Sequence, residues 1–305
     1  MMATRCSVAQ MYLVEVRLLA GTFPDTATLE TALDIAARAP SVQNAQPWRW
    51  RVSRDGVGLY ADWSRQLGNT ESDRRDVLLS CGAVLDHCVT AFAAVGWYPR
   101  VRRFPDPDDT SHLALIELVE LPARQVNIEL AAAIPRRRAD RRRYRARPIP
   151  AGTLEWFHIR AARSGVTLGV VPKIRWTRLD DGDVILRYGG GVDDGIRSHS
   201  DDAAMVVLGI DADIDPMRLR AGETLSQIIL SATAMGLATC PLTEPLKDTR
   251  NRVALACEVF DGEAHPQLLI RLGWAPTEGD PPAPRERRSV AETTTWDQRP
   301  LSMNF

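Results

Sequence analysis

Two long and almost unbroken apolar stretches constrain the fold of this chain more than any other feature. The first runs from Ser72 to Gly96, and the second runs from Leu219 to Cys240 with Gly236 near its end. A helix that is apolar on most of its faces must be buried on most of its faces, and a glycine just past the last apolar turn is a typical stop signal. The sequence therefore predicts two central helices with the rest of the chain packed around them.

The remaining sequence alternates between helical and strand-like patterns. Apolar residues recur at helical spacing over 28–39, and alternation around Asp55-Gly56 indicates a β-hairpin. We also expect a helix over about 152–163 and strands over 112–121, 204–211 and 266–276, the last being the final strand before a basic tail. Residues 189–202, rich in Gly and Asp, are typical of a loop or lid. This mixture predicts an α+β fold.

The chain contains a weak internal repeat. "LLSCGAVLDHCVTAFAAVGW" in the first half matches "TLSQIILSATAMGLATC" in the second, and both are preceded and followed by strands. We therefore predict two related halves, residues 1–121 and 122–305, that reproduce within one chain a two-fold dimer.

Charge and cysteine content exclude several classes of protein. The 38 basic and 39 acidic residues leave a net charge of -1, which provides no global field toward nucleic acid or membranes. Glu15 and Arg17 interrupt the N-terminal apolar segment, so we expect neither a signal peptide nor a membrane span. The five cysteines lack metal-ligand spacing, which predicts buried free thiols in a cytoplasmic protein and no metal site.

Eight arginines fall within residues 136–147. They could form a solvated linker or a nucleic-acid surface, although only Tyr144 interleaves them. They could also bind phosphate, which guanidinium groups hold bidentately, and Arg137 and Arg141 would share one face if this segment were helical. A second basic group, 285–288, could close over the same phosphate.

Signatures of other catalytic classes are absent from the sequence. No GxGxxG follows a strand, and the five histidines stand alone without a nucleophile motif. His87 lies in the first apolar stretch and is interpreted as a core residue.

The segment "ARAPSVQNAQPWRW", 37–50, carries more polar side chains than a connector needs. Its hydroxyl and carboxamide groups are suited to a flat ligand with polar edges. "APSVQNAQPWRW" resembles the APSxxNxQPWxF signature of the FMN-dependent nitroreductase family, and "RRADRRRY" resembles the RRSxRxF phosphate motif of that family. "GLATCPLTEPL" and "LLIRLGWAPTEGDPPAPRERRSV" resemble its late helix end and its terminal strand. The order of these motifs is most similar to the fused Acg-type branch of mycobacteria.

The resemblance implies a nitroreductase-like fold with one FMN per chain, the loop coming from the first half and the arginines from the second. It places the phosphate at Arg137, Arg141 and Arg288, the ring and ribityl contacts at Ser41 and Asn44, and the reactive edge near Pro241, Leu242 and Thr243. The remaining residues implied to line the cofactor are Gln46, Pro47, Trp48, Arg49 and Trp50. Ala139 departs from the motif, since the family has Ser or Thr there.

The function implied is hydride transfer from NAD(P)H through FMN to a nitroaromatic or quinone-like acceptor. Because the cofactor carries the chemistry, no separate catalytic acid or base is required. The alternative is a protein that stores or sequesters FMN with little turnover. We expect neither nucleic acid nor membrane as a partner, and a monomer is sufficient because one chain reproduces a dimer.

Overall fold

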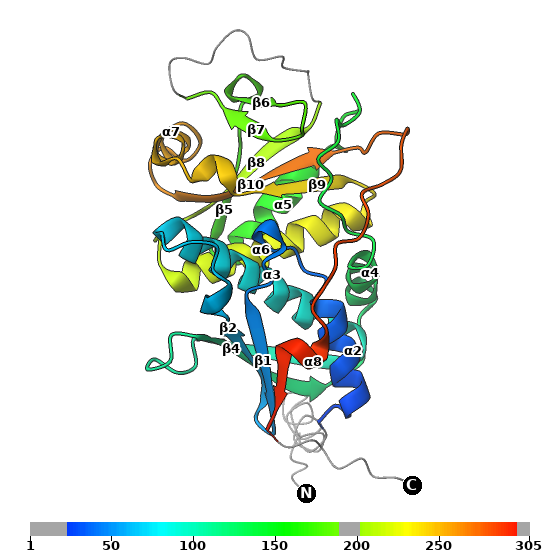
Figure 1. The fold of residues 1–305 in the computed structure, drawn as a ribbon. Helices are drawn as coiled ribbons and strands as arrows, with labels where there is room; N and C mark the ends of the chain where they lie inside the picture. The colour runs from blue at the N-terminus through cyan, green and yellow to red at the C-terminus, as the bar shows by residue number, and fades with distance from the viewer. Residues whose placement is uncertain (1–22, 189–201, 298–305) are drawn as a thin grey trace, which may run out of the picture.

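The computed structural model describes residues 23–188 and 202–297, and these form two units, each with its own sheet (Figure 1). The first unit runs α2 (Thr26–Ala36), β1 (Trp48–Ser53), β2 (Gly56–Ala61), α3 (Glu71–Ala94), β3 (Trp97–Arg103) and β4 (His112–Glu120). The second runs α5 (Thr153–Ala162), β5 (Val166–Val170), β8 (Ala204–Ile210), α6 (Asp215–Ala234), β9 (Ala238–Leu242) and β10 (His265–Gly273). Both units therefore follow the order helix, two strands, helix, two strands.

The strand order is also the same in the two sheets. The four strands of the first unit named above are ordered β1-β2-β4-β3 within their sheet, and those of the second are ordered β5-β8-β10-β9. The second unit adds the small sheet of β6 (Trp176–Arg178) and β7 (Val184–Leu186) and the helix α7 (Thr249–Phe260). Between the units lies α4 (Gln125–Ala133), which packs against both α3 and α6.

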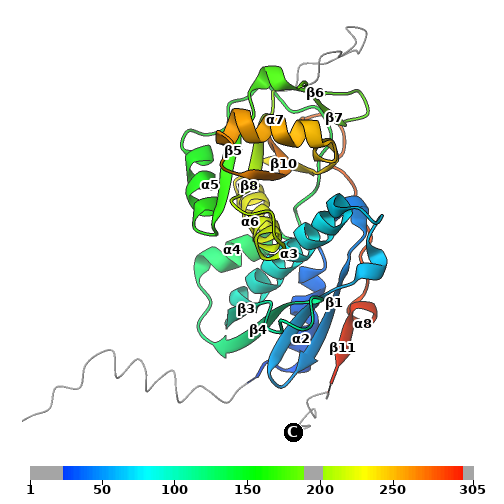
Figure 2. The same ribbon diagram turned by 90° about the vertical axis from the view of Figure 1, so that its left-hand side faces the viewer.

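Helices α3 and α6 pack together between the two sheets (Figure 2). At their crossing, a Cβ on Gly82 would clash with the Leu219 carbonyl oxygen, and a Cβ on Gly222 would clash with the Leu79 carbonyl oxygen. These contacts are reciprocal, because Leu79 and Leu219 each lie three residues before their glycine. Reciprocal contacts are typical of a two-fold axis, and glycine is required because the backbones approach so closely.

The predicted central helix of the first unit is confirmed, although its start differs. Thr70, rather than Ser72, caps α3 in a capping box with Asp73. An 18-residue window of α3 has a mean hydropathy of 1.7, sufficient for a membrane span by composition and length, but 83% of that window is buried inside the fold. The apolar character of α3 is accounted for by its central position between α6, α2 and the first sheet.

The C-terminal segment crosses from the second unit back to the first, as the red ribbon in Figure 1 shows. After β10, the chain runs extended to α8 (Val290–Thr293) and β11 (Thr294–Trp296). Strand β11 pairs in parallel with β1, with Trp50 opposite Thr294. The prediction that β10 is the final strand was therefore wrong, and the first sheet has five strands.

Two further expectations need correction. Helix α4 ends at Ala133, so Arg137 and Arg141 do not share a helical face; the segment beyond it is a turn followed by extended chain. Cys257 is exposed, whereas Cys81, Cys88 and Cys240 are buried free thiols as predicted. The predicted lid lies outside the described residues except at Asp202, as do Cys6, Glu15 and Arg17.

Candidate cofactor-binding site

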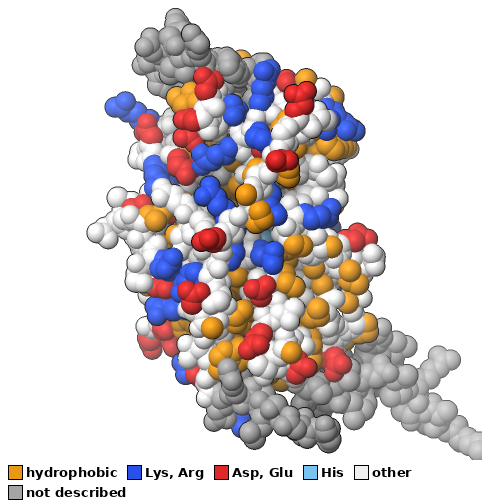
Figure 3. Space-filling model, turned by 45° about the vertical axis from the view of Figure 1, so that its right-hand side comes forward, with side chains coloured by type: hydrophobic (Ala, Val, Ile, Leu, Met, Phe, Trp, Pro, Cys, Tyr) orange, Lys and Arg blue, Asp and Glu red, His pale blue; other side chains and the backbone are white. Residues whose placement is uncertain are grey.

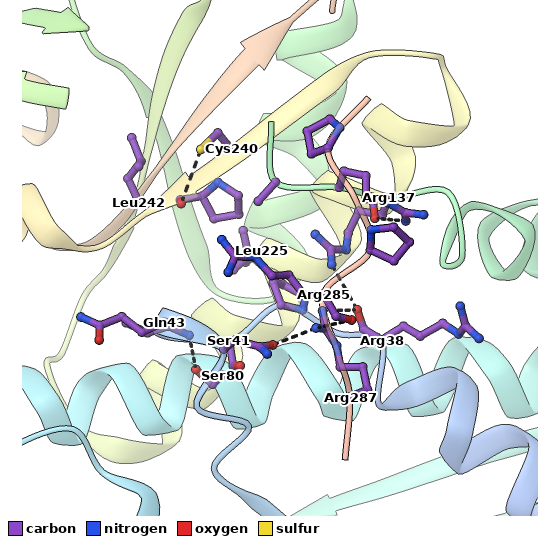
Figure 4. A pocket seen from close by; sticks show the side chains of 18 of the residues that line it. Arg38, Ser41, Gln43, Ser80, Arg137, Leu225, Cys240, Leu242, Arg285 and Arg287 are labelled. Atoms are coloured by element: carbon purple, nitrogen blue, oxygen red, sulfur yellow. Dashed lines mark hydrogen bonds between the residues drawn. The ribbon is translucent and has the colours of Figure 1, made fainter. Parts of the chain in front are cut away.

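A cavity of about 970 Å³ lies between the two units, within the range of small-molecule sites. It is lined by the 40–44 loop and α3 of the first unit, by α6, by the 134–141 segment, by β9 and the residues after it, and by the C-terminal segment. In Figure 4, Arg38, Arg137 and Arg287 lie toward one end of the cavity, and Gln43, Cys240 and Leu242 lie toward the other. The cavity therefore has a basic end and a less charged end.

The loop 41–46 is held in an unusual backbone conformation. Gln43, Asn44 and Gln46 have φ angles of 49°, 59° and 49°, in the left-handed region that non-glycine residues rarely adopt. The Ser41 hydroxyl accepts a hydrogen bond from the Gln46 N–H at 3.0 Å, and the Ser80 hydroxyl accepts one from the Val42 N–H at 3.2 Å. Such strain persists where the surroundings impose it, and it is concentrated at functional sites.

The carboxamides of this loop hold the C-terminal segment. Asn44 donates to the Glu286 carbonyl at 3.1 Å and accepts from Arg287 at 2.8 Å. Gln46 accepts from the Arg288 N–H at 2.9 Å. The polar side chains that the sequence interpretation directed at a ligand thus also join the first unit to the tail, and this contact positions Arg287 in the cavity.

Two guanidinium groups converge at the basic end. Arg137 and Arg287 both donate to the Arg38 carbonyl oxygen, at 3.1 and 3.4 Å. Arg137 is only 6% exposed, and within the described residues its Nε and Nη1 have no hydrogen-bond partner. The Nε of Arg287 likewise has none there.

The electrostatics of this end favour an anion. Burial, together with the nearby charges of Arg287 and Arg138, lowers the pKa of Arg137 to about 9. Burial and the charges of Arg138, Arg285 and Arg38 lower the pKa of Arg287. A buried cation without a counter-charge costs several kcal/mol, so a bound dianion would relieve both the desolvation and the repulsion.

The cavity lining includes seven of the residues implied by the resemblance: Ser41, Asn44, Arg137, Arg141, Pro241, Leu242 and Thr243. Arg141 is 46% exposed at its side chain and pairs with Asp183, which the β6–β7 connection supplies. It therefore has a counter-charge, whereas Arg137 has none among the described residues.

The other six implied residues are not part of the lining. Trp48 and Trp50 point into the core, and Arg49 points to the opposite face of β1, 3.3 Å from Asp62. Gln46 and Pro47 connect the loop to β1. Arg288 donates to the Gln46 carbonyl at 3.2 Å and the Trp48 carbonyl at 3.4 Å, whereas Arg285 and Arg287 are the tail arginines that line the cavity.

Several lining residues were missed by the sequence interpretation. They are members or neighbours of the recognised motifs, or residues of the central helices, namely Arg38, Gln43, Leu79, Ser80, Leu225, Cys240 and Glu244. Arg138 and Arg285 also line the cavity, and both belong to the two arginine groups that the sequence analysis considers for phosphate binding. Arg38 borders a recognised motif, so adjacency could have identified it. Leu79, Ser80 and Leu225 carry no local signal, because only the helix crossing brings them to the cavity.

The fold and the cavity define the class of this protein: an α+β chain with two units of matching topology that jointly enclose a basic site. Comparisons with known proteins agree. The chain is 39% identical over 324 residues to "Putative NAD(P)H nitroreductase Rv3131" of Mycobacterium tuberculosis, covering 92% of this chain and 94% of that protein. It is 31% identical over 320 residues to "Putative NAD(P)H nitroreductase acg" of the same organism, covering 89% and 96%. The chain therefore belongs to the nitroreductase family, and the fold class predicted from the motifs is confirmed.

No protein-family model matches the chain. Among solved structures, a nitroreductase with bound FMN from Bacteroides fragilis aligns with 52% of this chain and 95% of its own, at 16% identity and a TM-score of 0.40. A "putative nitroreductase" from Anabaena variabilis aligns with 86% of this chain and 91% of its own, at 11% identity and a TM-score of 0.49.

Proposed function

We propose that this protein binds one FMN in the cavity between its units and acts as an NAD(P)H-dependent flavin oxidoreductase toward nitroaromatic or quinone-like acceptors. The observation that carries the proposal is the buried Arg137 guanidinium, which has unpartnered N–H groups and converges with Arg287 at one end of a cavity of suitable volume. Both mycobacterial relatives reported above carry the name "Putative NAD(P)H nitroreductase".

The residues present fit this cofactor. Arg137 and Arg287 would hold the phosphate, with Arg138 adding positive charge, and the missing hydroxyl at Ala139 would leave this binding to guanidinium groups. The loop 41–44 and β9 would line the ring at the opposite end. When bound, FMN supplies the hydride and electron transfer, while the protein positions it and excludes water.

We further propose that one chain reproduces the two-fold arrangement of a dimer and that it works in the cytoplasm. The matching strand orders and the reciprocal glycine contacts support the first part. The loop and Arg287 meet through Asn44, so a single chain supplies both parts of the site.

The test is the visible spectrum of the purified chain under anaerobic conditions. We expect a yellow protein that NADH or NADPH bleaches within seconds to minutes and that a quinone reoxidises. A yellow protein that only dithionite bleaches would favour the storage alternative. A colourless protein that takes up no added FMN would contradict both.

A further inference from the structure

A group of buried polar side chains lies behind the cavity wall, at the start of α3. Asp76 is 3% exposed, and neither of its carboxylate oxygens has a hydrogen-bond partner within the described part of the chain. The hydroxyl of Thr243 is buried and lacks a hydrogen bond of good geometry there as well. The Thr243 hydroxyl lies near enough to the Asp76 carboxylate to lower its pKa.

This group is connected to the cavity through Thr243. Thr243 lines the cavity, as does Ser80, one helical turn beyond Asp76, whereas Asp76 itself lies behind them. The Ser80 hydroxyl donates to the Asp76 backbone carbonyl at 2.7 Å, so it does not satisfy the carboxylate. Thr243 therefore stands between a buried acid and the less charged end of the cavity, where Leu242 lies (Figure 4).

Charges of both signs lie near the Asp76 carboxylate. Lys247 has its Nζ 3.7 Å from the carboxylate, and Arg75 adds a second positive charge, while Glu244 adds a negative one. Lys247 is shared with Asp73, at 3.5 Å, and is 36% exposed. Burial outweighs the two cations and raises the pKa of Asp76 to about 6. A buried acid that titrates near neutrality beside a cavity is characteristic of functional sites.

We propose that Asp76 is the proton source of this site, acting through the hydroxyl of Thr243. The inference rests on the proposed function. Reduction of a quinone takes two electrons and two protons, and the hydride supplied by NAD(P)H through the bound cofactor brings two electrons and one proton. The second proton comes from the Thr243 O–H bond and goes to the acceptor oxygen, while the Asp76 proton restores the hydroxyl. Asp76 is left as a carboxylate and regains a proton from solvent past Lys247.

The experiment compares Asp76→Asn and Thr243→Val with Asp86→Asn. Asp86 is a matched control, because it is a buried carboxyl on the same helix whose pKa burial also raises to about 6, but it bonds to Ser226 and Gln227 at the helix crossing. Stopped-flow measurements follow flavin reduction by NADPH and reoxidation by a quinone separately. For the first two variants we expect reoxidation to slow by about 10- to 100-fold and to lose its decline above pH 6. We expect flavin reduction by NADPH to slow less than reoxidation, and Thr243→Ser should recover most of the reoxidation rate.

A second readout needs neither flavin nor turnover. Carbon-13 NMR of the aspartate carboxyl groups in the flavin-free protein should show a signal that titrates near pH 6 and disappears in Asp76→Asn. In Thr243→Val that titration should move to higher pH, whereas the Asp86 signal stays in place. If the chain binds no flavin, the proposed function fails while this titration can still be observed. If the chain turns over and Asp76→Asn reoxidises with the wild-type rate and pH profile, the proton-source assignment is wrong.

Discussion

The surroundings of Arg137 in the flavin-free protein are unfavourable for its positive charge. Its guanidinium is buried, lies near Arg138 and Arg287, and has no carboxylate partner within the described residues. Arg137→Met keeps most of the side-chain volume and removes the charge. We expect it to raise the free energy of unfolding of the flavin-free protein by about 1–3 kcal/mol and to lower FMN affinity at least tenfold.

The matched control is Arg141→Met. Arg141 is exposed and already paired with Asp183, so its loss should change the stability by less than about 1 kcal/mol and FMN affinity less than the loss of Arg137. Denaturant unfolding and flavin titration measure the two quantities. Equal flavin affinity in wild type and Arg137→Met would show that this end of the cavity does not hold the phosphate.

Asp86 and His87 are adjacent buried groups whose titrations oppose each other. Burial raises the pKa of Asp86 to about 6 and lowers that of His87 to about 3. Because Asp86 binds its proton more tightly when folded, its contribution to stability is lost as pH rises from about 4 to 6. His87 binds its proton more tightly when unfolded, so its contribution grows as pH rises from about 3 to 6.5.

The unfolding free energies of the two single variants, relative to wild type, should therefore change with pH in opposite directions. Between pH 4 and 6.5, Asp86→Asn should gain stability relative to wild type as pH rises, and His87→Leu should lose it, each by about 1–3 kcal/mol. The free energy of unfolding measured at several pH values gives both slopes. Slopes of the same sign would contradict the assigned directions of the pKa shifts.

At the level of elements, the crossing of α3 and α6 can be tested through its two glycines. An alanine in an open helix position adds about 1 kcal/mol of stability over glycine. Here the added Cβ would meet a carbonyl of the opposite helix in both cases, so Gly82→Ala and Gly222→Ala should each lower the unfolding free energy by about 1–3 kcal/mol. Thermal or denaturant unfolding checks this, and stabilisation by either variant would show that the helices do not cross so closely.

The elements show how far the sequence could predict the site. The apolar stretches, the Asp55-Gly56 hairpin and the motif order were sufficient for the fold class, because these signals are local. The conformation of the 41–46 loop was not predictable, since glutamine gives no signal for a positive φ. The choice of Arg287 over Arg288 depends on the path of the tail, which the pairing of β11 with β1 determines.

The position of the basic tail was also not predictable from the sequence. By composition it was indistinguishable from a solvated segment, whereas the structure places it across both units. In Figure 3, basic side chains are spread over the middle of the face along which this segment runs. Arg287 takes its position from Asn44 and from the Arg38 carbonyl, both of which belong to the first unit. Long-range contacts of this kind carry no signature within the segment itself.

At the scale of the whole molecule, the stoichiometry of the site follows from its construction. The loop, Arg137 and Arg287 all belong to one chain and contact one another directly or through Arg38. We expect one FMN per 33.8 kDa chain, with an FMN dissociation constant that does not depend on protein concentration from micromolar to nanomolar. Flavin fluorescence on dilution and analytical ultracentrifugation measure these quantities. Loss of FMN in step with dissociation of a larger species would show that two chains build each site, and the intramolecular two-fold proposal would then fail.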